Sequence, residues 1–170
     1  KTAVNHPRGK NMIGAFYQPK LVVIDLDTLK TLPEKELRAG LAEVVKYGVI
    51  ADPELFAFLE NNSEKILSLN PDCLEHIIET SCAIKAQVVE KDERESRHRM
   101  ILNFGHTFGH SIEALTNYTK YLHGEALSIG MVQAALLSVE TGLCSKDVPI
   151  RITNLLKKFG LPVQTPGLGS

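Results

Sequence analysis

Three of the six histidines in this sequence, His106, His110 and His123, lie close together along the chain. His106 and His110 are four residues apart in a segment with helical spacing, so their imidazoles project from the same face of a helix. One helix offers two ligands to a zinc ion with this spacing. Thr107 stands where the HExxH motif of zinc peptidases has its glutamate, so the general base of those enzymes is missing. Histidines that are satisfied by hydrogen bonds alone are the alternative, but the third histidine, at a predicted helix start, favours a metal.

A carboxylate is expected to complete such a metal site. A catalytic zinc ion usually takes three protein ligands and leaves one position open, and the sequence has no CxxC pair of thiolates. Glu43 is a candidate because its neighbours on a predicted helix are apolar, and burying a carboxylate there is costly unless it is paired or binds a cation. A partly exposed Glu43 bonded to Lys46, three residues later, is the alternative. Glu113 and Glu125 are the other candidates for this ligand.

Basic side chains suggest a second property, the binding of an anion. Lys46 lies one turn after Glu43, and Lys85 interrupts the apolar stripe of the longest predicted helix. Arg99 precedes the first histidine of the cluster. A lysine in an apolar stripe either extends its amine to solvent or faces an anion. Three cations that converge on the histidines would suit a substrate with a phosphate or a carboxylate. The GKN string at 9–11 lacks the GxxxxGK[ST] pattern, so a P-loop is excluded.

These side chains need a scaffold, and the hydrophobic pattern predicts a mainly helical one. Residues 1–20 have no helical period and are typical of a loop-rich or short-strand segment. Residues 21–25 are a short β-branched run, which predicts a buried strand. Beyond them, apolar residues recur at helical spacing. Helices are expected from Pro33 to about Val49, from Pro53, again from Asn61–Ser63, from Pro71 to about Glu93, from Gly105 to Thr116, from Gly124 to Gly142 and from Lys146 to Phe159.

One strand followed by a series of helices predicts a mainly α fold, preceded by the end of an α/β domain. We place the boundary near Leu32, so that residues 1–32 belong to the N-terminal domain and residues 33–170 to the helical one. Because the chain begins with Lys1 rather than with methionine, we expect it to be a segment of a longer protein.

Composition narrows the class of protein. Nineteen Lys+Arg against 20 Asp+Glu give a net charge of −1, which argues against a nucleic-acid-binding protein that relies on overall positive charge. No apolar run approaches the ~18–20 residues of a membrane-spanning helix. The cysteines Cys73, Cys82 and Cys144 are odd in number and indicate no disulfide framework. We therefore expect a cytoplasmic protein with neither a membrane nor a nucleic acid as its partner.

Several short strings are specific enough to suggest a family. They are KTAVNHP at 1–7, GKN at 9–11, RAGLAEVVKYG at 38–48, KAQVV at 85–89, DERE at 92–95, LNFGHTFGH at 102–110 and HGE at 123–125. In this order they resemble the 3-dehydroquinate synthase family, a branch of the sugar-phosphate cyclases. By this resemblance the family is longer than the chain, with a Rossmann-like NAD-binding α/β domain in front and further residues after position 170.

The resemblance implies a role for each matching position. Glu43, His106 and His123 match metal ligands, for zinc or cobalt, while His110 would face the substrate outside the metal's coordination shell. The positions that match the substrate pocket, and to which catalysis is assigned, are Asn11, Lys46, Lys85, Arg99, Asn103 and His110. The positions that match NAD contacts are Lys1, Lys10, Thr28, Leu29, Lys30 and Thr31.

The activity implied by the resemblance is that of a phosphate-eliminating lyase. It converts 3-deoxy-arabino-heptulosonate 7-phosphate into 3-dehydroquinate and phosphate, a step of the shikimate pathway of aromatic amino acid biosynthesis. NAD is reduced and reoxidised within the cycle, and the metal lowers the pKa of the substrate alcohol. The family also implies a homodimer. Two alternatives remain, a related cyclase acting on sedoheptulose 7-phosphate or glucose 6-phosphate, and a metal-binding domain without catalysis.

The sequence departs from the family pattern at two positions. Arg97 stands where a glycine is usual, so we expect the turn that presents Arg99 to differ. Arg8 replaces a leucine, a surface change that we expect to be neutral. The family's C-terminal lysine would lie beyond residue 170, so we expect this chain by itself to bind metal without catalysing the reaction.

Overall fold

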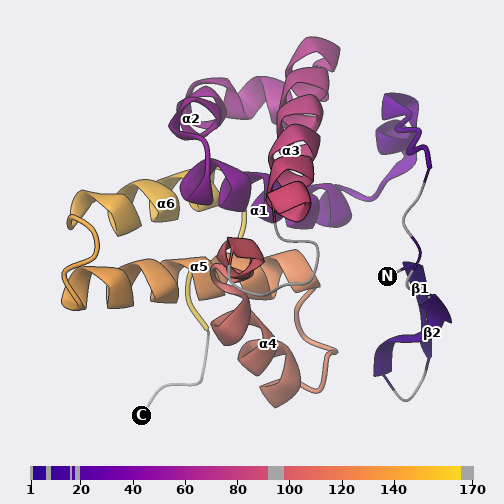
Figure 1. Cartoon of the computed structure of the whole chain (residues 1–170). Helices are drawn as coiled ribbons and strands as arrows, with labels where there is room; N and C mark the ends of the chain where they lie inside the picture. Colours follow the sequence, from indigo (N-terminus) through magenta and orange to yellow (C-terminus); the bar gives the residue numbers. More distant parts are fainter. Residues whose placement is uncertain (1, 7–8, 16, 18–19, 92–97, 166–170) are drawn as a thin grey trace.

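The computed structural model describes residues 2–6, 9–15, 17, 20–91 and 98–165. It begins with an antiparallel hairpin of β1 (Thr2–His6) and β2 (Gly9–Ala15), which lies beside a body of helices (Figure 1). Val4 is paired with Ile13. The hairpin agrees with the prediction of short strands in the first twenty residues.

The apolar run at 21–25 does not form the predicted buried strand. Among the described residues it pairs with no strand, and Leu21 and Val23 are 78% and 81% exposed. A β-branched run becomes a buried strand only where a neighbouring strand satisfies its backbone and a packed layer covers its side chains. The described sheet consists of β1 and β2 alone, so this segment has neither.

A short 3₁₀ helix, η1 (Leu26–Thr31), leads from this run into the helical body. The Asp25 side chain caps it, and Leu29 packs against the core. The first long helix, α1 (Glu34–Ile50), begins directly after Pro33 and agrees with the predicted span.

The next two helices, α2 (Pro53–Leu67) and α3 (Pro71–Lys91), also start at prolines. The sequence predicts that a new helix starts near residues 61–63. Asn62 has non-helical backbone angles, with a φ of −120°, so a kink divides α2 into two helical parts at the predicted place. The Asn62 side chain donates a hydrogen bond to the Phe58 carbonyl one turn earlier, and such local bonds bend a helix without ending it.

A second 3₁₀ helix, η2 (His98–Asn103), precedes three further helices. These are α4 (His106–Leu115), α5 (His123–Glu140) and α6 (Asp147–Lys158). They agree with the predicted spans to within one or two residues. Gly160 follows α6 with a φ of +70°, the left-handed conformation typical of a glycine that ends a helix.

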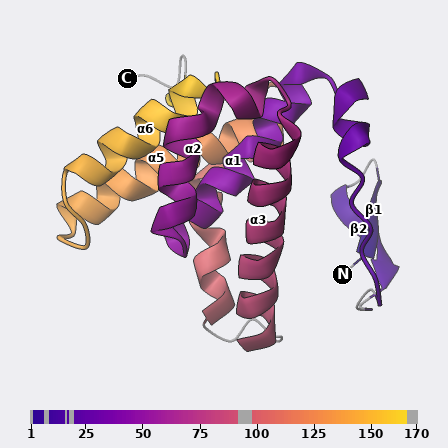
Figure 2. The ribbon, with the colours of Figure 1, turned by 90° about the horizontal axis from the view of Figure 1, so that it is seen from above.

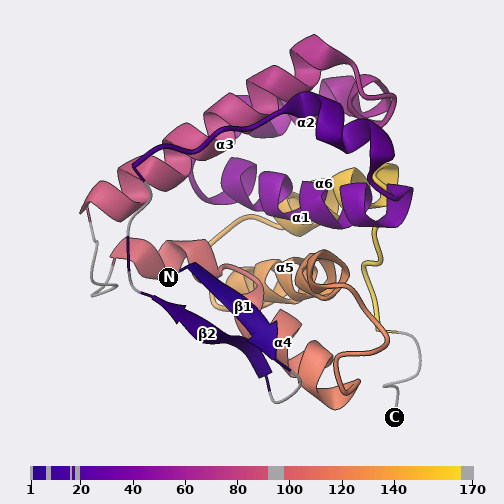
Figure 3. The ribbon, with the colours of Figure 1, turned by 90° about the vertical axis from the view of Figure 1, so that its right-hand side faces the viewer.

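The helices lie in three levels, with α2 and α3 on one side, α1 and α6 in the middle and α4 and α5 on the other side (Figure 3). Viewed from above, α3 lies between the hairpin and the helices α2, α5 and α6 (Figure 2). The main core joins the levels, with Val45, Leu59, Ile77, Leu127 and Leu156 among its buried members. The predicted mainly α fold is confirmed. No helix in the described ranges is both long and apolar enough to cross a membrane.

Candidate metal centre

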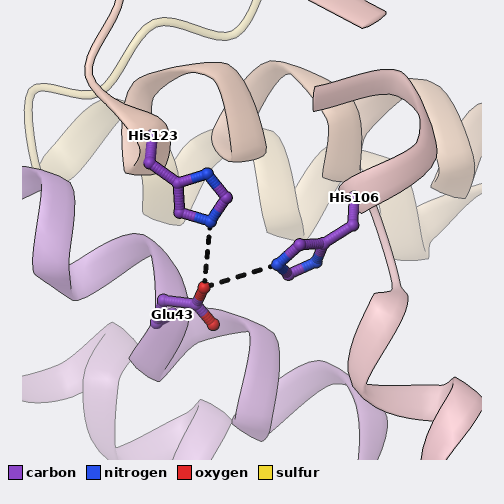
Figure 4. Close-up of side chains that lie close together, drawn as sticks. All are labelled: Glu43, His106 and His123. Carbon is purple, nitrogen blue, oxygen red and sulfur yellow. Dashed lines mark ion pairs between the residues drawn. The ribbon is translucent and has the colours of Figure 1, made fainter. Parts of the chain in front are cut away.

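Three side chains from three helices point toward one another between α1, α4 and α5 (Figure 4). Glu43 lies within α1, His106 is the first residue of α4, and His123 is the first residue of α5. The Oε1 atom of Glu43 is 3.5 Å from Nε2 of His106 and 3.4 Å from Nε2 of His123. Each residue offers one ligand atom within 4.8 Å of the other two.

These separations match those of ligands around a shared cation. A charge-assisted hydrogen bond between nitrogen and carboxylate oxygen is about 2.7–2.9 Å long, which is shorter than the 3.4 and 3.5 Å observed. Zinc binds nitrogen and oxygen at about 2.0–2.2 Å, and a tetrahedral angle then places two ligand atoms about 3.3–3.6 Å apart. The donor set, two imidazoles and a carboxylate, also suits zinc or cobalt.

Two glycines allow the helices to approach closely enough to form this cluster. A Cβ atom at Gly124 would lie 1.9 Å from the Ala39 carbonyl oxygen, so the start of α5 rests directly on α1, one turn before Glu43. A Cβ atom at Gly130 would lie 2.1 Å from the carbonyl oxygen of Gly105, just before α4. Only glycine permits such close backbone contacts. Gly124 and Gly130 therefore allow the helix starts that carry His123 and His106 to lie close to Glu43.

Each of the two histidines also has a partner on its other ring nitrogen. Nδ1 of His106 lies 3.4 Å from the Phe104 carbonyl oxygen, and Nδ1 of His123 lies 3.3 Å from Oε2 of Glu113. An acceptor at Nδ1 favours the tautomer with the proton on that nitrogen. The Nε2 lone pair is then available to a metal, which is the usual arrangement of metal-binding histidines.

Opposing effects act on the carboxylate of Glu43. Burial by itself would raise the pKa of Glu43, but the contacts with His106 and His123 and the nearby Lys46 ammonium hold this pKa well below its usual range. Nζ of Lys46 lies 2.6 Å from Oε2 of Glu43, and the Lys46 side chain is only 5% exposed. Glu43 is therefore ionised at neutral pH, with Oε2 fixed by Lys46 and Oε1 facing the histidines.

Two neighbouring groups have raised pKa values. The contact with Glu43 raises the pKa of His123; burial opposes this shift, and Glu113 adds to it. Burial, together with the charge of Glu43 and with Cys82, raises the pKa of Tyr47 to about 12. The Tyr47 phenol is therefore neutral near pH 7, while His123 binds a proton readily when no metal competes for it.

The other residues predicted to act on the substrate differ in their exposure and in the groups that they contact. His110 is exposed on α4, with its ring centroid 5.4 Å from that of His106 and 5.8 Å from that of His123. Lys85 is exposed on α3, and Asn103 is exposed at the end of η2. Lys46 is buried and forms an ion pair with Glu43. The structure thus brings His110 and Lys46 to the metal centre.

Several predicted positions cannot be compared at the level of side chains. Lys10 and Asn11 lie in β2 and Arg99 lies in η2, but only their backbone is described. Lys1, Arg8 and Arg97 lie outside the described residues. The predicted NAD loop, Thr28, Leu29, Lys30 and Thr31, is part of the 3₁₀ helix η1, with Leu29 packed inward and Lys30 paired with Asp27 at 2.7 Å.

Glu113 and Glu125, the other candidates for the carboxylate ligand, make contacts different from those of Glu43. Glu113 is buried and contacts His123 from the side opposite Glu43. Its spacing from His106, seven residues along the same helix, places both on one face but does not by itself indicate a contact with His123 on α5. Glu125 accepts a hydrogen bond from the Leu122 amide at 2.8 Å and caps α5. The contact of His106 with the Phe104 carbonyl could not be predicted from the sequence, because every residue has a backbone carbonyl.

Solved structures with the same fold carry a metal and a nucleotide. A 2-epi-5-epi-valiolone synthase from Streptomyces hygroscopicus subsp. jinggangensis, with NAD+ and Zn2+ bound, matches with a TM-score of 0.85 and 29% identity over 97% of this chain and 46% of its own. A 2-deoxy-scyllo-inosose synthase complexed with carbaglucose-6-phosphate, NAD+ and Co2+ matches with a TM-score of 0.79 and 31% identity over 96% of this chain and 45% of its own.

Sequence comparisons are more specific. The 3-dehydroquinate synthase of Thermodesulfovibrio yellowstonii is 62% identical over 98% of this chain and 46% of its own length, and that of Desulforamulus reducens is 58% identical over 99% and 47%. The chain thus spans about half the length of the curated relatives that it matches. Family models described as 3-dehydroquinate synthase N-terminal and C-terminal match residues 1–39 and 40–169. With these matches along its whole length, the chain belongs to the 3-dehydroquinate synthase family.

Proposed function

We propose that this chain carries the metal centre of a 3-dehydroquinate synthase, which converts 3-deoxy-arabino-heptulosonate 7-phosphate into 3-dehydroquinate and phosphate. The observation that carries the proposal is the meeting of Glu43, His106 and His123 at zinc-ligand separations, in a chain 62% identical to a 3-dehydroquinate synthase. The proposed reaction belongs to the shikimate pathway.

The proposed cofactors are NAD and a divalent metal, zinc or cobalt. Similar cyclases have been solved with NAD+ and either Zn2+ or Co2+ bound, and the donor set of this chain suits both metals. When bound, NAD would take up and return a hydride, and the metal would lower the pKa of the substrate alcohol that loses it. Glu43, His106 and His123 would hold the metal.

Around this centre, the chain's own residues would bind and orient the substrate. His110 is exposed beside both metal-binding histidines, so it can take up or give back a proton at the substrate. Lys85 and Asn103 are exposed and free of the core, as groups that bind phosphate or hydroxyl oxygens must be. Lys46 would act through Glu43, because its ammonium holds the Oε2 atom. Asn11 and Arg99 remain proposed substrate contacts, and Lys1, Lys10 and residues 28–31 remain proposed NAD contacts.

The related cyclases are the second candidate, because the structural matches include enzymes of that kind with TM-scores of 0.85 and 0.79. Phosphate release from 3-deoxy-arabino-heptulosonate 7-phosphate, sedoheptulose 7-phosphate and glucose 6-phosphate separates the candidates, each measured with NAD and zinc on an intact enzyme of the relatives' length that carries these residues. We expect turnover of the heptulosonate phosphate alone. Turnover of either other sugar phosphate in its place would contradict the proposal, and binding of metal without turnover of any of them would favour a non-catalytic metal-binding domain.

We also propose that the protein is a cytoplasmic homodimer. Exposed apolar side chains such as Leu136, Leu143 and Ile150, near the connection between α5 and α6, support a further interface. The described cysteines are all free, which suits a reducing compartment. Light scattering at micromolar concentrations should give the mass of a dimer, and a monomeric mass throughout would contradict this part of the proposal.

A further inference from the structure

Glu113 is a buried carboxylate next to the metal centre. It is 2% exposed, and its neighbour Ile112 forms a small apolar core with Ala126 and Ile129 of α5. A carboxylate in such surroundings is stable only where a polar or charged partner compensates for the lost water. Oε2 of Glu113 lies 3.3 Å from Nδ1 of His123. The same imidazole faces Glu43 through its other nitrogen, at 3.4 Å.

We propose that Glu113 is a positioning residue of the metal centre, which holds the Nδ1 proton of His123 and so directs the Nε2 lone pair toward the ion shared with Glu43. This inference rests on the metal centre of the proposed function and assigns a residue that acts on the ion only through another side chain.

The chemistry of imidazole gives Glu113 this effect. A neutral imidazole has one protonated and one unprotonated nitrogen. A carboxylate accepts hydrogen bonds and donates none, so its presence at Nδ1 selects the tautomer with the proton there. The negative charge also makes the Nε2 lone pair a stronger ligand than a neutral acceptor would. Replacing Glu113 with glutamine, which can donate as well as accept, removes both the charge and the selection of one tautomer.

The two histidines of the site form an internal comparison. Nδ1 of His106 faces a neutral backbone carbonyl at 3.4 Å, whereas Nδ1 of His123 faces a carboxylate at 3.3 Å. The carbonyl belongs to the segment that leads into α4, and Glu113 belongs to α4 itself. The same helix therefore supplies one ligand, His106, and the group that orients the other, so both imidazoles are fixed relative to one rigid element.

Glu113 as a direct ligand is the competing interpretation, since His110, Glu113 and His123 also offer ligand atoms within 4.8 Å of one another. A metal at that position would use Nδ1 of His123, and the unprotonated nitrogen cannot then be Nε2 in a neutral ring. Such a metal would leave Glu43 and His106 without an ion, although both face Nε2. The geometry therefore favours Glu113 as the orienting group.

The test compares Glu113→Gln with the wild-type protein and with Glu60→Gln. Glu60 is a matched control because it too is a paired carboxylate, 2.6 Å from Arg151, but on α2. Dissociation constants for Zn2+ and Co2+ are measured by competition with a chromogenic chelator, and the visible absorption of bound Co2+ is recorded. We expect Glu113→Gln to weaken the binding of both metals about 10–100-fold and to shift the Co2+ bands. Glu60→Gln should change neither, and both variants should keep the wild-type circular dichroism.

Unchanged affinity and an unchanged Co2+ spectrum in Glu113→Gln would overturn the proposal. Complete loss of metal, equal to that in Glu43→Gln, would identify Glu113 as a ligand and would also overturn it. If Glu113→Gln fails to fold, nitrogen NMR of His123 in the metal-loaded wild-type protein decides: a proton on Nδ1 supports the proposal, and a proton on Nε2 contradicts it. Because no readout uses turnover, an intact enzyme that binds metal but converts no sugar phosphate would contradict the proposed function and not this inference.

Discussion

His123 reaches Glu43 with Nε2, while His110, the i+4 partner of His106, stays exposed on α4. Spacing on one helix therefore identified two neighbouring imidazoles but not the pair that faces the carboxylate. That pair comes from the first residues of two helices, whose meeting depends on tertiary packing. The chemistry of each histidine is decided by what its two nitrogens face, and these partners are far apart in the sequence.

Substitutions of single ligands test the metal centre. In an intact enzyme, Glu43→Gln and His106→Ala should remove stoichiometric zinc and activity together, because each leaves only two ligands for the ion. His110→Ala should retain the zinc and lower kcat by about 10²–10⁴-fold, the usual contribution of a positioned proton-transfer group. Metal analysis and steady-state kinetics of the purified variants check this. Stoichiometric zinc in Glu43→Gln would contradict the assignment.

The protonation of His123 predicts how metal binding depends on pH. The contact with Glu43 raises the pKa of His123 above 6.5, and a protonated imidazole cannot bind a metal. Affinity is therefore fully present above the raised pKa and is lost as the pH falls through it, beginning above pH 6.5. The pKa of Glu43 is held low, so this carboxylate stays ionised in the same range. Zinc titrations from about pH 5.5 to pH 8.5 measure the effect, and affinity that is constant down to the lower limit would contradict it.

Some individual residues could be singled out from the sequence because a strong local reason existed. Glu43 stood out because a carboxylate among apolar neighbours needs a compensating charge, and the structure places it against two histidines and Lys46. Glu113 was considered only as a competing ligand. Its contact with His123 could not be derived, because it depends on how α4 and α5 pack rather than on any spacing within one helix.

At the scale of secondary-structure elements, α1 and α5 approach so closely that no side chain fits at Gly124. Gly124→Ala should destabilise the protein by about 1–3 kcal/mol, the usual cost of overpacking, because its Cβ atom would lie 1.9 Å from the Ala39 carbonyl oxygen. Gly40→Ala is the matched control, since a Cβ atom there meets nothing within 4 Å. This change in the interior of α1 should stabilise the protein by about 0.5–1 kcal/mol.

Urea denaturation of the two metal-free variants measures these effects on the free energy of unfolding. Gly124→Ala should also weaken zinc binding, because α5 would carry His123 away from Glu43. Equal stability of the two variants would mean that α5 does not rest on α1 as the structure describes.

Helix spans were predictable because prolines, caps and apolar periodicity act locally. Asp52 and Pro53, for example, start α2 at the predicted place. The break expected near residue 62 is present as the kink at Asn62, and apolar residues on both sides of it pack into the same core. The prediction of a strand at 21–25 was wrong, since strand formation depends on a partner elsewhere in the chain rather than on the run itself.

At the scale of the whole molecule, metal binding and catalysis should have different requirements. All three proposed ligands lie between Glu43 and His123, whereas the N-terminal family model matches only residues 1–39 and the chain covers 46% of a typical relative. We expect the 170-residue chain alone to bind zinc but to release no phosphate from the heptulosonate phosphate above background. Orientation of two reactants can be worth ~7–11 kcal/mol, so a protein that does not hold NAD against the substrate should lose nearly all the rate. Measurable turnover with NAD and zinc would contradict this expectation.

Because His106 and His123 are the first residues of α4 and α5, the positive ends of two helix dipoles converge on the metal centre. They attract negative charge at the open face of the site, while Glu43 supplies the single carboxylate among the proposed ligands. The centre is consequently more electropositive than its formal charges suggest. Anions such as inorganic phosphate, the product of the proposed reaction, are therefore natural competitors for the place that the substrate occupies.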